Sequence, residues 1–148
     1  MPEADAASLL REVLDALTEH DLDRVAAVVD EQFEFVDVGG GEEAHGRGQW
    51  RAFCGRFVKA FPDLTQEVTN LVDAGESAYA EVIARGTHTG PLETPDGDVP
   101  PTGRTIAVRF CVVVRARGGR LVDGREYYDS ATLLSQLGLL SGSAEAGD

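Results

Sequence analysis

Apolar residues change their spacing about halfway along the chain. In the first half they recur every three to four residues, which predicts amphipathic helices over residues 5–18, 22–29 and 49–61. Pro62 ends the last of these, because proline lacks the N–H that a continuing helix requires. The exception in this half is a short alternating run over residues 33–38, which is typical of a strand.

After Pro62 the apolar residues recur at every second position, which is the spacing of a strand with one buried face. Further strands are predicted over residues 65–72, 78–88, 104–116 and 121–129. Ser130 can cap a final helix over 131–139, and residues 141–148 read as a flexible tail. Helices followed by consecutive strands predict one α+β domain over residues 1–148. We expect a curved antiparallel sheet that forms a cone over the N-terminal helices, with a pocket at its open end.

The balance of charged residues limits the classes of partner that the protein can bind. Thirteen basic residues against 26 acidic ones give a net charge of −13, which disfavours nucleic acid and anionic membranes. No apolar run approaches the ~18 residues of a membrane span, and the first residues lack the pattern of a signal peptide. We therefore expect a cytoplasmic protein that binds neither nucleic acid nor membrane.

Metal and cofactor motifs are missing from the sequence. Cys54 and Cys111 have no CxxC spacing, and the three histidines have no HxxxH or HxH pattern, so we expect free thiols and no metal site. The glycine-rich stretch GGGEEAHGRG lacks the spacing of a phosphate loop, and no dinucleotide fingerprint occurs.

An aspartate near the C-terminus occupies an unusual position, in REYYDSATLLSQLG between an aromatic strand and an apolar helix. If Gly118-Gly119 forms a two-residue turn, Val108 lies opposite Asp129 and Phe110 lies opposite Tyr127. Asp129 and Tyr127 then point to the apolar face of the sheet. Desolvation there raises the pKa of a carboxyl group toward the range useful for acid–base catalysis.

Two alternatives stay open for Asp129. Either it or Ser130 can cap the final helix, with the carboxylate accepting backbone N–H groups. A slip of one residue in the strand register also exchanges the two faces of the strand, and with them the position of Asp129.

Other candidate residues have a structural as well as a functional interpretation. His88 follows a strand face of small residues that leaves room for a ligand, or it is a structural histidine. Asp37 shares a strand face with phenylalanines and points inward, or it starts the following turn. Trp50 and Phe53 belong to the core, and Trp50 can also line a pocket mouth.

Several segments together resemble the SnoaL-like polyketide cyclases of the nuclear-transport-factor-two-like superfamily. The segments are ALTEHDLDRVAAVVDEQFEFVD, HGRGQWRAFCGRFVKAFPDL, ARGTHTGPL, PPTGRTIAVRFCVVVRARGGRLVDGREYYD and SATLLSQLGLL. They follow one another in the expected order from about residue 8 to residue 140.

The resemblance implies a cofactor-free enzyme that closes a ring of an aromatic polyketide by intramolecular aldol condensation. It implies that Asp129 is the acid/base and that His88 lies in or near the pocket. We add Tyr127 as a hydrogen-bond donor to the enolate oxygen. With Asp37, Trp50, Phe53 and Phe110, Tyr127 completes the expected substrate-binding set.

Other functions of the same fold remain alternatives. A hydroxylase would use a similar pocket, and an epoxide hydrolase would need an Asp–Arg–Asp set such as Asp37, Arg85 or Arg125, and Asp129. A ligand-binding module without catalysis is a third alternative. The mixed sheet face carrying Arg109 suits a homodimer or a higher homo-oligomer.

Overall fold

The computed structural model describes residues 4–140. The helices are α1 (Ala6–Thr18), α2 (Leu22–Ala27), α3 (Gly46–Ala60) and α4 (Ser130–Gln136). The strands are β1 (Val29–Asp37), β2 (Glu42–His45), β3 (Thr65–Ala74), β4 (Ser77–Thr87), β5 (Leu92–Thr94), β6 (Gly97–Val99), β7 (Thr105–Arg117) and β8 (Arg120–Tyr128). The 141–148 tail predicted from the sequence lies outside the described residues.

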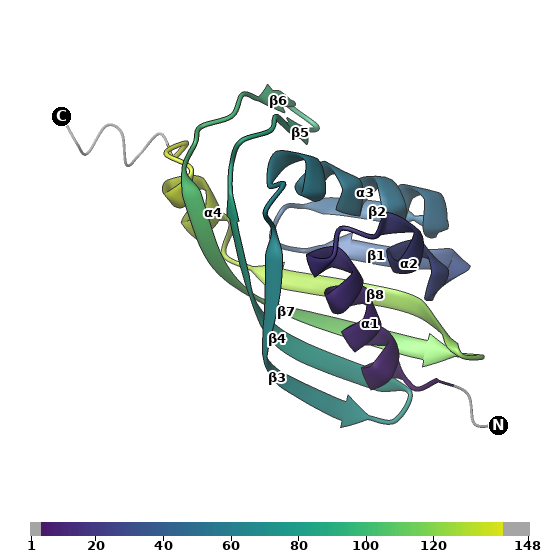
Figure 1. Ribbon diagram of the computed structural model, residues 1–148. Helices are drawn as coiled ribbons and strands as arrows, with labels where there is room; N and C mark the ends of the chain where they lie inside the picture. The colour runs from purple at the N-terminus through teal and green to yellow at the C-terminus, as the bar shows by residue number, and fades with distance from the viewer. Residues whose placement is uncertain (1–3, 141–148) are drawn as a thin grey trace.

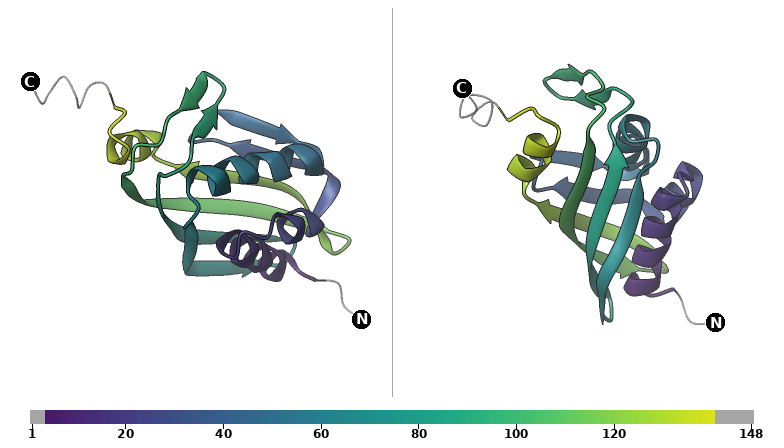
Figure 2. Two further views of the ribbon diagram at one scale, coloured as in Figure 1. Left: turned by 45° about the horizontal axis from the view of Figure 1, so that its top comes forward. Right: turned by 60° about the vertical axis from the view of Figure 1, so that its left-hand side comes forward.

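Six strands form one curved sheet in the order β2-β1-β8-β7-β4-β3, and β5 and β6 form a separate small hairpin. The three N-terminal helices lie against the inner face of the sheet, and α4 lies at one end of the strands, beside the start of β7 (Figure 1, Figure 2). This confirms the predicted α+β fold with a curved, unclosed sheet. One pairing differs from the prediction, because β1 and β8 run parallel and the sheet is therefore mixed.

The local sequence explains most element boundaries. Asp5 caps α1 by accepting the N–H of Ser8 at 2.8 Å. The second helix ends earlier than predicted, because the chain extends into β1 already at Val29. Strands β2, β5 and β6 lie where the sequence predicted only connections, since strands of three or four residues are too short to show a periodic pattern.

A β-bulge in β8 decides which residues face inward. Arg117 pairs with Arg120 across the Gly118-Gly119 turn, as predicted, but Val122 has no partner in the ladder. Beyond it the register shifts by one, so Phe110 lies opposite Tyr128 rather than Tyr127. The predicted pairing of β8 from residue 123 onward is therefore wrong.

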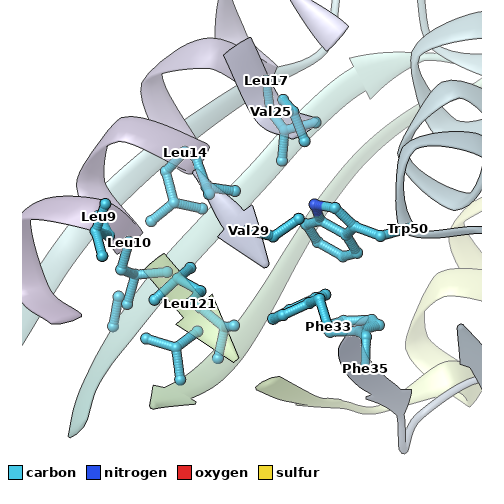
Figure 3. Close-up of a cluster of buried hydrophobic side chains, with 14 of the residues drawn as sticks. Leu9, Leu10, Leu14, Leu17, Val25, Val29, Phe33, Phe35, Trp50 and Leu121 are labelled. Atoms are coloured by element: carbon cyan, nitrogen blue, oxygen red, sulfur yellow. The ribbon is translucent and has the colours of Figure 1, made fainter. Parts of the chain in front are cut away.

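The core fills the space between the helices and the sheet. The ring of Trp50 on α3 lies 5.3 Å from that of Phe33 and 4.6 Å from that of Phe35, with the leucines of α1 opposite (Figure 3). Cys54 and Cys111 are both free thiols, as predicted. Within residues 4–140, no helix is both long and apolar enough to cross a bilayer.

Candidate active site

A cavity of about 120 Å³ lies between the helices and the inner face of the sheet. Its wall comes from α1, α3, α4 and the strands, and most of its side chains are leucine, valine, isoleucine or phenylalanine. Among the described residues that line it, the hydrogen-bonding side chains are those of Trp50, Gln66, Glu126 and Tyr128, with the thiol of Cys54. An apolar cavity with a few polar groups is the usual form of a small-molecule site.

Three carboxylates lie side by side at one end of the sheet. Asp37 of β1 pairs with Glu126 of β8 on one side and with Glu42 of β2 on the other. Asp37 is only 1% exposed, and Glu126 lines the cavity. The row therefore puts negative charges on adjacent strands at a place that is partly shielded from water.

This crowding changes the acidity of the inner carboxyl groups. Burial raises the pKa of Glu126 to about 8, and the charges of Asp37 and Glu42 add to that effect. Burial also raises the pKa of Asp37, while the N–H of Gly40 opposes the rise. Two neighbouring carboxylates repel each other, so one of the carboxyl groups keeps its proton to a higher pH. Glu126 is therefore largely protonated near neutral pH.

Tyr128 connects the carboxylate row to the cavity. Its hydroxyl lies 3.4 Å from Asp37 Oδ2, toward which it donates, and its ring lines the cavity. Burial and the negative charges of Asp37 and Glu126 raise the pKa of Tyr128 well above its ordinary value. The phenol therefore stays protonated and can act as a hydrogen-bond donor throughout the physiological range.

An arginine of α3 neutralises the charge of Glu42, the carboxylate at the β2 end of the row. Arg56 contacts Glu42 at 2.7 Å, and both side chains are about four-fifths buried, being 21% and 23% exposed. The guanidinium also lies 5.3 Å from the centre of the Phe53 ring and donates to the carbonyl of Glu93 on β5 at 3.3 Å. The ion pair thus ties α3 to β2 and β5 beside the carboxylate row.

The glycine loop after β1 packs directly on this cluster. Gly40 donates its N–H to Asp37 Oδ1 at 2.9 Å. A Cβ added at Gly40 would overlap Asp37 Oδ2 and would stand 3.0 Å from Tyr128 Oη. The contact requires a residue without a side chain. The close approach to a carboxylate therefore explains the glycine at position 40 of the glycine-rich stretch.

We expect Gly40→Ala to lower the free energy of unfolding by about 1–3 kcal/mol, because the new methyl group displaces the buried Asp37 carboxylate. Gly48→Ala is the matched control, since a Cβ there meets nothing within 4 Å and alanine favours the helix. Urea unfolding of both variants measures the difference. Equal stability of the two variants would contradict this packing.

Most of the predicted substrate-binding residues meet in the cavity. Trp50, Phe53 and Phe110 line its wall. Asp37 lies behind that wall, in contact with Tyr128. Tyr127 lies elsewhere, because the β8 bulge turns it to the outer face, where it is 43% exposed.

Asp129 is the N-cap of α4 and does not line the cavity. Its carboxylate accepts the N–H of Ala131 at 3.1 Å and the hydroxyl of Thr132 at 2.8 Å. The expectation that Asp129 faces the apolar side is wrong, because it rested on the register without the bulge. Capping was the alternative given by the sequence, and the geometry agrees with it.

His88 is fully buried but lies outside the cavity wall. Its Nδ1 accepts the N–H of Thr102 at 3.2 Å, and its ring lies 5.4 Å from that of Phe61. Burial lowers the pKa of His88, so the ring is neutral. These contacts fasten the connection between β4 and β7, and His88 does not meet Glu126 or Tyr128.

The Asp–Arg–Asp arrangement of an epoxide hydrolase does not form within residues 4–140. The side chain of Arg85 pairs with Glu67, and that of Arg125 lies 3.7 Å from Asp123. Both arginines are exposed, so neither joins Asp37 to Asp129. The described residues also contain no cluster of three or more His, Cys, Asp or Glu side chains that could hold a metal ion.

Sequence analysis missed Glu126 and Tyr128 as site residues, although a signal was present. The register that omitted the bulge placed Asp123, Arg125 and Asp129 on the apolar face, and burying three charges there is costly. The alternative face carries Gly124 with Glu126 and Tyr128, which suits a cavity better. The adjacent apolar pair before Asp123 also breaks the alternation where the bulge occurs.

The curved sheet, the helices on its inner face and the cavity between them define the ketosteroid isomerase-like, or nuclear-transport-factor-two-like, class of α+β proteins. A hypothetical protein with this fold from Catenulispora acidiphila superposes with a TM-score of 0.75 at 20% identity, covering 90% of this chain and 95% of that one. The family model described as SnoaL-like polyketide cyclase matches residues 7–137. The chain therefore belongs to the SnoaL-like polyketide cyclase family, and the resemblance noted from the sequence is confirmed.

Two further solved structures are similar over most of their length. IdmH from Streptomyces antibioticus, a candidate polyketide cyclase, has a TM-score of 0.71 and 27% identity, covering 88% of this chain and 96% of that one. AclR from Streptomyces galilaeus, a candidate hydroxylase, has a TM-score of 0.75 and 22% identity, covering 90% of this chain and 84% of that one. A search of curated proteins found no significant match.

Proposed function

We propose that this protein is a cofactor-independent polyketide cyclase that closes a ring by intramolecular aldol condensation, with Glu126 as its acid/base. The observation that carries the proposal is a carboxyl group of raised pKa in the wall of an apolar cavity, beside a second carboxylate and a phenol. Family membership and the likeness to IdmH support a small aromatic polyketide as the substrate.

Glu126 fits both proton transfers of an aldol closure. In its ionised form it takes a proton from a carbon next to a carbonyl, and it is a stronger base than an ordinary carboxylate because its pKa is about 8. The enolate carbon then attacks a second carbonyl of the same molecule, forming the carbon–carbon bond. The alkoxide so formed takes the proton back from Glu126, and the net reaction is an isomerisation.

Tyr128 and Asp37 have supporting roles in this mechanism. The phenol of Tyr128 has one O–H, which points toward Asp37 in the free protein. When substrate binds, this O–H turns away from Asp37 and donates to the oxygen that becomes negative in the enolate, which stabilises the transition state. Burial and the negative charge of Asp37 keep the pKa of Glu126 high. The apolar wall holds the substrate folded so that its two reacting carbons meet.

The test is product analysis with an aromatic polyketide ester that carries an acidic carbon between two carbonyls and a third carbonyl as acceptor. Ring closure gives a product of unchanged mass, or one that has lost water after dehydration. Gain of an oxygen atom would identify a hydroxylase instead, and gain of water a hydrolase. Heat-inactivated protein gives the rate of spontaneous closure, and turnover equal to it would overturn the proposal.

A further inference from the structure

A polar side chain that the proposed chemistry does not use lies in the cavity wall across the sheet from Glu126. Gln66 is on β3, at the opposite edge of the sheet from the carboxylate row, and it lines the same cavity. Its Oε1 atom is buried and has no hydrogen-bond partner among residues 4–140. A buried acceptor without a hydrogen-bond partner lowers the stability of the fold, so the presence of a glutamine at this position calls for an explanation.

The backbone around Gln66 is held firmly. The N–H of Gln66 donates to Thr18 Oγ1 at 2.8 Å, and the His20 ring contacts the carbonyl of Leu64 at 3.0 Å. These contacts join the start of β3 to the end of α1. The side-chain amide is therefore presented from a fixed position, while its last torsion remains soft enough to turn toward a ligand.

The sheet order gives the separation between the two polar ends of the cavity. From β3 to β8 the sheet passes through β4 and β7, which makes three strand spacings or about 14 Å across the strands. The register adds an offset along the strands: Gln66 is level with Val108 of β7, and Glu126 pairs with Val112, four residues or about 13 Å further along. The wall between them is apolar and includes Ala84, Val108 and Phe110. A ligand that contacts both ends must therefore be elongated, with an apolar middle.

We propose that Gln66 is a specificity-determining residue that hydrogen-bonds a hydroxyl group on the substrate ring farthest from the reacting carbonyl. The ligand class is an elongated fused-ring molecule with the enolisable carbonyl at Glu126 and Tyr128 and a phenolic hydroxyl at the opposite end. A hydroxyl suits this place because it can donate to Oε1 or accept from the amide nitrogen. The inference rests on the proposed function in one respect, namely that the enolisable carbonyl of the ligand lies at Glu126.

Binding of two matched probes tests the inference without turnover. The probes are 2-hydroxyanthraquinone, which has a hydroxyl at one end, and anthraquinone, which has none. The protein contains a single tryptophan, Trp50, which lines the cavity, so quenching of its fluorescence reports occupancy. At a pH of about 5.5 the phenol of 2-hydroxyanthraquinone and the carboxyl group of Glu126 are both largely protonated, which removes charge differences between the two complexes.

We expect the wild-type protein to bind 2-hydroxyanthraquinone about three- to tenfold more tightly than anthraquinone. Gln66→Met, which is similar in size but lacks the acceptor, is expected to bind both probes equally. Its resistance to urea should equal or exceed that of the wild type, since an unpartnered buried atom is removed. Gln32→Met is the matched control at an exposed position of β1 and should keep the preference.

Three outcomes would overturn the inference: no preference in the wild type, a preference that survives in Gln66→Met, or no binding of either probe. The proposed function fails separately. A protein that shows the preference but does not close a ring overturns the proposed reaction alone. A protein that closes the ring without any preference between the probes overturns the role of Gln66 alone.

Discussion

Glu126→Gln is expected to lower the rate of ring closure by about 10²–10⁴-fold, the usual contribution of a general acid–base group. The amide keeps the shape of the side chain and can neither take nor supply the proton. Glu126 lines the cavity next to Asp37, so under our proposal the change acts where the substrate binds. Steady-state kinetics with the polyketide ester measure kcat and KM, and the loss should fall mainly on kcat.

Asp129→Asn is the matched control, because it makes the same chemical change at the residue that sequence resemblance implied. Asparagine is as good an N-cap as aspartate, so α4 should remain intact. Under our proposal this variant retains activity close to that of the wild type. Full activity in Glu126→Gln together with loss of activity in Asp129→Asn would restore the original prediction and reject ours.

The second large effect is on stability, and it needs no substrate. Folding raises the pKa of Glu126 from 4.5 to about 8, so between these values the folded protein keeps a proton that the unfolded chain gives up. The folded state binds more protons in that window, and stability therefore falls as the pH rises through it. The stabilising contribution of protonation is complete below pH 4.5, and the destabilisation is complete above about pH 8.

Glu126→Gln removes this dependence, so it should be more stable than the wild type at pH 9 by about 2–4 kcal/mol, and equal to it near pH 4. Urea unfolding at a series of pH values measures the difference between the two proteins. Glu31→Gln, an exposed position on β1, is the control and should follow the wild type. A difference that does not change with pH would mean that Glu126 is ionised normally in the folded protein.

Under our proposal, the same feature of the site lowers the stability of the fold and supports catalysis. A carboxyl group forced to keep its proton beside Asp37 is unfavourable for folding above neutral pH, and it is also what makes Glu126 a strong base. Gln66 follows the same logic, because its unpartnered oxygen is unfavourable until a ligand occupies the cavity. Substitutions at both positions should therefore stabilise the protein while impairing it.

The family resemblance and the periodicity were enough to predict the fold. The apolar stripe of α1, the proline after α3 and the alternation in β7 each reflect burial of one face, which is a local property of the sequence. The inward aromatic residues of the cavity, Trp50, Phe53 and Phe110, followed from the same patterns. The homodimer expected from the outer sheet face stays a prediction, as does a catalytic role for His88.

The chemistry of the site depended on features without a local signature. A single unpaired residue, Val122, exchanges the two faces of β8, and so brings Glu126 and Tyr128 into the cavity while sending Tyr127 outward. The parallel pairing of β1 with β8 joins residues about ninety positions apart and places Asp37 next to Glu126. The sequence alone determined the fold, the apolar wall and the acidic character of the chain. Only the tertiary structure decided which carboxylate lies in the wall, because strand register and the proximity of charges arise from pairing between distant segments.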